Sequence, residues 1–268
     1  MTGDVGLPRG SISGVSLASR SHLENADEET ASEGYARRFA GEVGEFFLGV
    51  QSRVVLDLLS PWPAVRVLDV GGGHAQIAVP LAHSGYGVTV AGSHESCRRR
   101  LDRFLEPGRV KFDVCDLLSL PYHDDAFDVV VAFRLLAHVK RWRRLVAEMC
   151  RVARRAVVID YPDLRSFNLV SQTFFRWKKA VEKNTRPFTC FTRRQLSREF
   201  ARYGFEEPTF RPEFFVPMVV HRAIGHASIS RALEAIGAGL GLRNLFGSPM
   251  VMRVVVAQAS VPSHRHVR

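Results

Sequence analysis

The chain has 268 residues, of which 46% are hydrophobic and 24% charged, and its 37 Lys and Arg against 27 Asp and Glu give a formal net charge of +10. This length can form one substantial α/β domain, and no apolar run is long enough for a membrane span or a signal peptide, so we expect a cytoplasmic protein. The four cysteines occur singly, without a C-x-x-C pair, which argues against a zinc site or a disulfide framework.

The character of the chain changes near residue 34. Residues 1–33 carry six acidic side chains and few large apolar ones, which predicts a disordered tail because such a segment buries too little surface to become ordered. From Tyr35 to Leu58 apolar residues recur every three or four positions, the pattern of an amphipathic helix. We therefore predict an N-terminal helical cap over residues 34–62, ended by its prolines.

A short apolar strand then runs into Gly71, Gly72 and Gly73. Glycine permits a sharp turn and a close approach to a ligand, and the apolar spacing over residues 77–82 predicts a helix directly behind the loop with unpaired N–H groups at its start. The G-x-G-x-x-G spacing of dinucleotide folds is absent. With Asp69 ahead of the glycines, the loop resembles motif I of class I S-adenosylmethionine-dependent methyltransferases, D-x-G-x-G-x-G; the alternative is an ordinary tight turn.

The next predicted strand, residues 87–91, ends at Gly92 and Ser93. The resemblance implies an acid here that binds both ribose hydroxyls, since a carboxylate accepts two hydrogen bonds in a fork. Gly92 in its place is the clearest departure from the family. Three alternatives stay open. Gly92 and Ser93 bind the ribose through backbone and hydroxyl contacts, cofactor binding is weakened, or the cofactor site is degenerate.

Residues 109–133 are a more specific match, because they resemble the D-x-x-x-L-P-F-x-D-x-S-F-D-x-V segment of the same family. By this resemblance Asp116 accepts a hydrogen bond from the adenine amine, with the Leu117 backbone N–H near the ring; a surface acid is the alternative for Asp116. Arg134 follows the next strand and is expected at the cofactor. The pattern Y-x-x-R-F beginning at Tyr35 resembles the entry helix of methyltransferases of the quinone-biosynthesis type, the type 11 group, whose tyrosine approaches the amino-acid end of the cofactor. The alternative is that Tyr35 is only the first residue of the helical stripe.

Strands and helices that alternate predict a parallel, doubly wound sheet, with ligands beyond the carboxyl ends of the strands. The resemblance implies the seven-stranded, mostly parallel α/β sheet of class I methyltransferases with helical cap insertions. We assign residues 63–161 to the S-adenosylmethionine-binding core and residues 162–260 to substrate-cap helices and closing strands of the same domain. Residues 261–268 are expected to be a disordered tail.

We therefore interpret the chain as a methyltransferase that binds S-adenosylmethionine, releases S-adenosylhomocysteine, and uses a small, apolar or aromatic acceptor. His138 is the first candidate for a base, ahead of His123, Tyr161 and Arg134, with a structural corner histidine as its alternative. No metal is expected. The basic composition keeps an RNA methyltransferase open, although a solvated arginine-rich surface is the commoner explanation. The Gly92 departure keeps a non-catalytic partner or ligand-binding protein open.

Overall fold

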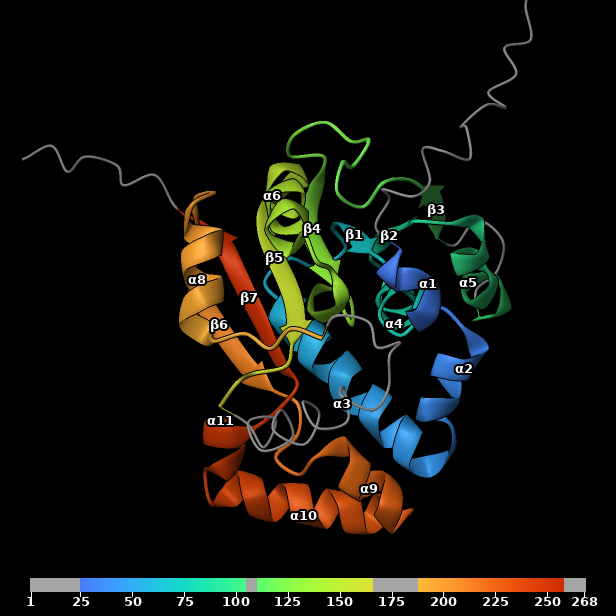
Figure 1. Cartoon of the computed structure of the whole chain (residues 1–268), viewed down its shortest axis with the longest axis vertical. Coiled ribbons are helices and arrows are strands. Elements are labelled where there is room, and N and C mark those ends of the chain that lie inside the picture. Colours follow the sequence, from blue (N-terminus) through green and yellow to red (C-terminus); the bar gives the residue numbers. More distant parts are fainter. Residues whose placement is uncertain (1–24, 105–109, 166–187, 258–268) are drawn as a thin grey trace, which may run out of the picture.

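The computed structural model describes residues 25–104, 110–165 and 188–257. They form a sheet of seven strands in the order β3-β2-β1-β4-β5-β7-β6 (Figure 1). The strands are β1 (Arg66–Val70), β2 (Gly87–Gly92), β3 (Lys111–Val114), β4 (Phe127–Ala132), β5 (Ala153–Tyr161), β6 (Phe205–Pro212) and β7 (Met250–Val256). The first five pair in parallel, and β7 lies antiparallel between β5 and β6. The predicted fold class is confirmed.

The central strands are near-continuous apolar runs because both faces of the sheet are covered. Every residue of β4 is buried. Alternate residues point to opposite faces, so Leu68 and Val130 belong to one buried cluster and Val67 and Val129 to the other. The register pairs Asp69 with Val131 of β4, which places the ends of β1 and β4 side by side.

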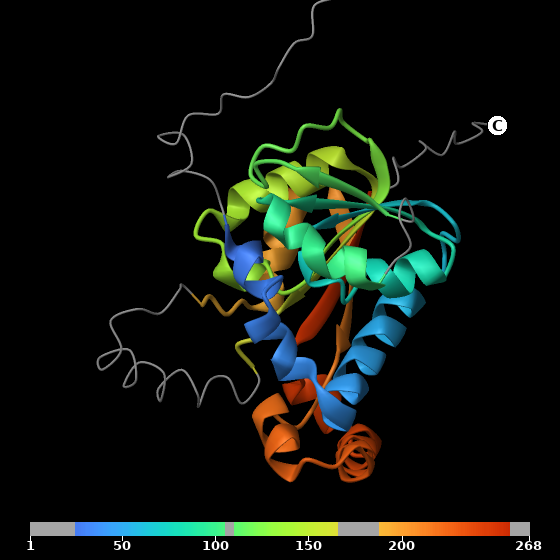
Figure 2. The same cartoon turned by 90° about the vertical axis from the view of Figure 1, so that its right-hand side faces the viewer.

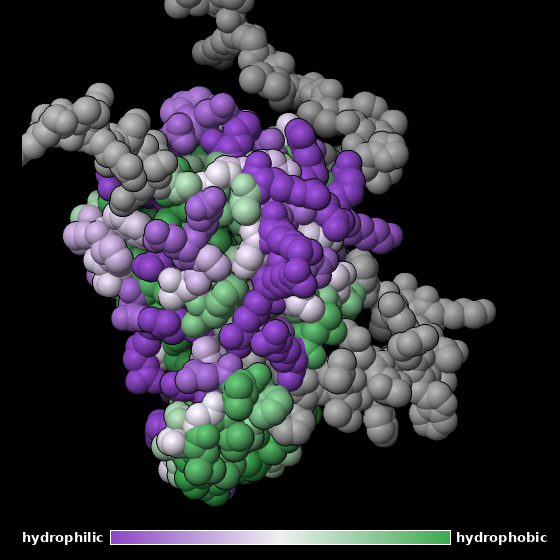
Figure 3. Space-filling view, turned by 90° about the vertical axis from the view of Figure 1, so that its left-hand side faces the viewer, coloured by the Kyte–Doolittle hydropathy of each residue, from purple (hydrophilic) through white to green (hydrophobic). Residues whose placement is uncertain are grey.

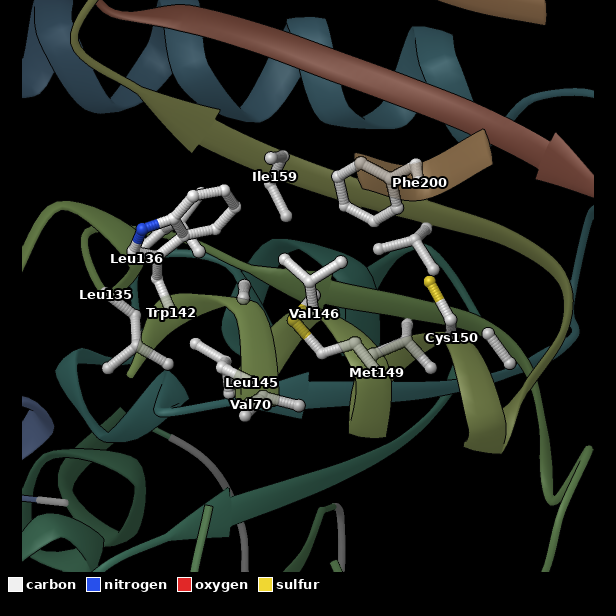
Figure 4. Close-up of a cluster of buried hydrophobic side chains, with 14 of the residues drawn as sticks. Val70, Leu135, Leu136, Trp142, Leu145, Val146, Met149, Cys150, Ile159 and Phe200 are labelled. Carbon is white, nitrogen blue, oxygen red and sulfur yellow. The ribbon is translucent and has the colours of Figure 1, made fainter. Parts of the chain in front are cut away.

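Helices cover the two faces separately, as Figure 2 shows. The helices α3 (Gly41–Leu59), α4 (Ala78–His83) and α5 (Arg99–Phe104) contribute side chains to one buried cluster. On the opposite face lie α6 (Trp142–Val152) and α8 (Arg193–Ala201). Figure 4 shows the α6 side chains gathered with Val70, Ile159 and Phe200. No helix among the described residues is both long enough and apolar enough to cross a membrane.

Three helices, α9 (Met218–Ile224), α10 (Ala227–Gly239) and α11 (Leu242–Phe246), form one end of the molecule between the closing strands β6 and β7. Figure 3 shows apolar side chains gathered there. The large exposed ones are Val219, Val220, Ile229, Ile236, Leu240, Leu245 and Phe246. Ile229 and Ile236 thus lie on the solvent-facing side of α10.

The N-terminal region differs from the prediction. Residues 25–33, expected in a tail, contain α1 (Ala26–Thr30) and the start of α2 (Glu33–Ala36), because α1 buries Ala26, Asp27 and Thr30 against the rest of the domain. The expected continuous helix from Tyr35 is broken, since Ala40 is extended and Gly41 has a φ of 72°. Residues 1–24, 166–187 and 258–268, on which other predictions fell, lie outside the described residues.

Candidate functional site

The three glycines form a compact turn at the end of β1. Gly71 has a φ of 73°, and its N–H donates to the Ala91 carbonyl at 2.8 Å, which ties the loop to the end of β2. A Cβ on Gly72 would collide with the Asp69 carboxylate, and one on Gly73 would lie 2.6 Å from the Cys97 carbonyl oxygen. Glycine is therefore required at 72 and 73 by close packing.

The helix behind this turn begins later than expected. A 3-10 turn spans Gly72–His74, Ala75 has a φ of 63°, and α4 begins only at Ala78 and has six residues. His74 bridges the turn: its Nδ1 accepts from the Gln76 N–H at 3.1 Å and its Nε2 contacts the Phe133 carbonyl at 3.1 Å. Burial lowers the His74 pKa to about 4 although the Phe133 carbonyl raises it, so the ring is neutral and Nε2 donates. His74 thereby joins the glycine turn to the end of β4.

Asp69 is fully buried behind the glycines. Neither carboxylate oxygen has a hydrogen-bond partner of normal geometry, although the Ala78 amide is close enough to lower its pKa. Burial outweighs that amide and raises the Asp69 pKa to about 7. Burying a carboxylate is costly unless a hydrogen-bond donor or a cation interacts with its oxygens. Asp69 is therefore suited to a ligand that carries such a donor or cation.

The end of β2 is bonded to a residue that the sequence did not indicate. The Ser93 backbone N–H donates to Asp27 Oδ2 at 2.8 Å, and the Ser93 hydroxyl donates to Asp27 Oδ1 at 2.5 Å. Asp27 comes from α1, which lies against the loops that follow β1 and β2 (Figure 1). Sequence reasoning missed Asp27 because its surroundings are acidic and polar.

Asp116 and Leu117 lie at the neighbouring strand end. The Cys115 N–H donates to the Gly92 carbonyl at 2.9 Å, so the segment that follows β3 runs beside the end of β2. Asp116 is half-buried, and its Oδ1 accepts from the Leu118 N–H at 2.9 Å. Leu117 is fully buried. Asp116 therefore fixes its own loop, and its predicted contact with adenine stays a prediction.

Arg134 follows β4 with a φ of 57°. Its backbone N–H donates to Asp160 Oδ1 at 2.6 Å, its Nε donates to Gln76 Oε1 at 3.2 Å, and its guanidinium lies 4.7 Å from the centre of the Phe39 ring. Burial lowers the Arg134 pKa, but nearby Tyr35, Glu213 and Asp160 outweigh it and raise the pKa. One terminal nitrogen, Nη2, is buried without a hydrogen-bond partner. A charged donor thus remains available just beyond β4, the strand next to the one that carries Asp69.

Two acids near Arg134 were also missed. Asp160 is the single charged residue in the apolar end of β5, a signal that could have identified it. Glu213 follows β6 and had no such signal. Burial raises its pKa to about 8 against the opposing charge of Arg134, and Gln51 Nε2 donates to Glu213 Oε1 at 3.3 Å. Tyr35 joins this group, since its burial raises its pKa and its neighbour Arg134 lowers it.

Comparison with known proteins identifies this arrangement. Residues 68–159 match the family model described as a methyltransferase domain. This segment matches a methyltransferase domain.

The methyltransferase domain resembles curated relatives over limited stretches. It is 30% identical over 115 residues to an O-methyltransferase of Pyrenophora dematioidea, covering 41% of this chain and 43% of that protein. It is 40% identical over 96 residues to Methyltransferase GfsG of Streptomyces halstedii, covering 33% and 34%. It is 34% identical over 86 residues to norajmaline N-methyltransferase of Rauvolfia serpentina, covering 31% and 29%. The matched part spans less than half the length of each of these relatives.

Solved structures extend the likeness of the fold to most of the chain. Magnesium protoporphyrin IX methyltransferase from Synechocystis with bound S-adenosylhomocysteine has a TM-score of 0.58 at 16% identity, covering 86% of this chain and 98% of that one. A Thermotoga maritima protein described as a possible histamine N-methyltransferase has a TM-score of 0.59 at 20% identity, covering 85% and 97%. At these identities the likeness establishes the fold.

The residues of the methyltransferase domain fit its cofactor. S-adenosylmethionine ends in an amino-acid group, which carries an ammonium and a carboxylate. Asp69 on β1 offers unpartnered carboxylate oxygens, and Arg134, just beyond the neighbouring strand β4, offers an unpartnered nitrogen. These opposite charges complement the two ends of that group.

The candidate bases of the methyltransferase domain lie in different places. His138 is in the 3-10 turn Leu136–His138 after β4, half-buried, with its ring 5.6 Å from that of Phe188. Tyr161 ends β5, with a hydroxyl that is buried without a partner and a pKa that burial raises. His123 is exposed in the loop before β4, at the amino edge of the sheet, and so the structure separates it from the site.

Proposed function

We propose that the protein transfers a methyl group from S-adenosylmethionine to a small organic acceptor. The observation that carries this proposal is the pair of unsatisfied buried groups, Asp69 and Arg134, beside the glycine turn of a methyltransferase domain. Relatives whose names specify O- and N-methyltransferases support a small acceptor but leave the acceptor atom open.

The bound cofactor would supply an activated methyl group on a sulfonium. The protein's task is then to hold the acceptor's lone pair in line with that methyl group and to exclude water. A hydroxyl or amine acceptor also has to lose a proton. His138 is our candidate for this proton acceptor, because it lies beyond the carboxyl end of β4 and is partly accessible.

An apolar or aromatic acceptor fits the surroundings of His138. Phe188 is 54% exposed, and its ring faces the His138 ring at 5.6 Å. The Thr189 N–H donates to the Ala137 carbonyl at 2.8 Å, which holds this chain segment against the turn that carries His138. An exposed aromatic ring at this place offers stacking area to a planar acceptor.

The fold alone does not determine the reaction. A protein titled as a [4+2]-cyclase, SpnF, shares it with a TM-score of 0.53 at 18% identity. The test therefore has two stages. Calorimetric titration with S-adenosylmethionine and S-adenosylhomocysteine, with NADH as the control ligand, measures cofactor binding. Transfer of a labelled methyl group to a panel of phenols and amines, with bulk RNA as a separate acceptor, then measures the reaction.

We expect micromolar binding of both adenosyl ligands, none of NADH, and transfer to small acceptors. Transfer to RNA alone would replace the small acceptor by the nucleic acid that the basic composition suggested. Tight cofactor binding with no transfer to any acceptor of the panel would favour a non-methylating use of the fold. Absence of adenosyl binding would refute the proposal.

A further inference from the structure

The end of β2 is tightly packed at the position of the expected acid. A Cβ on Gly92 would lie 2.7 Å from Phe112 Cζ and 3.3 Å from Cys97 Cβ. Phe112 is on β3, which pairs with β2 in parallel, and its ring occupies the space that a side chain at position 92 would need. An acidic side chain at position 92 would therefore have to displace the Phe112 ring.

A carboxylate nevertheless lies at this strand end. Asp27 accepts both from the N–H and from the hydroxyl of Ser93, the residue directly after Gly92. The Asp27 Cβ is also 3.3 Å from the position that a Cβ would take on Gly71. The Asp27 carboxylate is thus held between the glycine turn after β1 and the end of β2, by two bonds that fix its orientation.

This carboxylate has unused capacity. Its two oxygens offer about four lone-pair sites; Ser93 fills two, and the Cys97 thiol approaches Oδ2 at 3.5 Å as a weak donor. Among the described residues no cation pairs with Asp27, although Asp27 is fully buried. Burying a carboxylate in this way is costly without further donors, and a pair of neighbouring hydroxyl groups would provide them.

We propose that Asp27 is the ribose-binding acid of this protein and accepts hydrogen bonds from both ribose hydroxyls of S-adenosylmethionine. This inference rests on the proposed function. Asp27 would thus take the role of the acid that is missing at the end of β2. It lies far away in the sequence, on α1, and its hydrogen bonds from Ser93 orient its carboxylate. Because Asp27 is fully buried within α1, the groups around its carboxylate have to rearrange for the ribose to reach it.

The test compares ligands with and without a ribose hydroxyl. S-adenosylhomocysteine and its 2′-deoxy counterpart are titrated calorimetrically into the full-length protein, into Asp27→Asn and into Glu29→Gln. Glu29 is exposed on the same helix and serves as the matched control. For Asp27→Asn we expect affinity for S-adenosylhomocysteine to fall by about tenfold or more, as for a lost buried hydrogen bond to a charged group, and affinity for the deoxy ligand to fall much less.

Loss of discrimination between the two ligands is the decisive outcome. A second variant, Ser93→Ala, removes one bond that orients Asp27 and should weaken S-adenosylhomocysteine binding several-fold, so that the inference stays testable if Asp27→Asn does not fold. The inference would be overturned if Asp27→Asn bound S-adenosylhomocysteine as tightly as wild type or more tightly, and still preferred it to the deoxy ligand by the wild-type ratio. Asp27 would then only hold α1 against the end of β2. If the wild-type protein binds neither ligand, the proposed function fails as well.

Discussion

Replacing Asp69 by Asn should change how the stability of the protein depends on pH. Burial raises the Asp69 pKa from 3.8 to about 7. Between these values the folded state binds more protons at this group than the unfolded state, so the contribution of Asp69 to stability falls as pH rises. From about pH 5 to about pH 8 this amounts to about 2 to 3 kcal/mol of unfolding free energy. Asn does not ionise, and any cost of its buried amide is the same at every pH.

The assay is urea unfolding of wild type and Asp69→Asn at several pH values across this range, with Asp57→Asn as a control at an exposed carboxylate. We expect the difference in unfolding free energy to move in favour of Asp69→Asn by about 2 to 3 kcal/mol as pH rises, while Asp57→Asn stays parallel to wild type. Asp69→Asn should also bind S-adenosylhomocysteine more weakly than wild type. A constant difference across the pH range would show that Asp69 ionises normally, and the reasoning from its burial would then be refuted.

Three further variants test other parts of the site. Asp116→Ala should weaken S-adenosylmethionine binding by about 1–3 kcal/mol. Asp116→Asn can still accept from the Leu118 N–H, so the same titration of this variant separates the adenine contact from support of the loop. Unchanged affinity in both variants would remove the adenine assignment. His138→Ala should lower turnover with little change in cofactor affinity, and equal turnover would leave His138 a structural residue. His74→Ala leaves the Gln76 N–H and the Phe133 carbonyl without their partner, so the free energy of unfolding in denaturant should fall by about 2–4 kcal/mol. A fall of less than about 1 kcal/mol would mean that water takes over the hydrogen bonds of the ring.

The sequence predicted the fold because the segments between residues 63 and 161 are locally unambiguous. The buried run of β4 can be read as a parallel strand since all its residues are apolar except Asp128, and that acid is held at the strand's start by the Arg66 N–H and by Arg154 and Arg155. The turn at Gly71 was predictable because glycine readily adopts the positive φ that a sharp turn after a strand requires.

The parts that the sequence did not predict depend on contacts between distant segments. Nothing in the local pattern marks Asp27, whose bonds cross 66 residues to reach Ser93. Likewise Glu213 is defined by Gln51, 162 residues earlier, and by the charge of Arg134. The Gly41 break was also hidden, because the apolar spacing from Tyr35 onward continues through it, whereas the backbone takes a positive φ there.

The clearest departure from the family motifs occurs where the structure brings in a group from elsewhere. At the end of β2, Gly92 leaves room for Phe112, while the carboxylate of Asp27 is bonded to the next residue. Judged by the motif alone, this departure would count as the loss of a functional residue. The structure places a buried carboxylate beside the same strand end, and so binding measurements on Asp27 and Asp69 are more informative than the motif pattern for deciding whether this site is active.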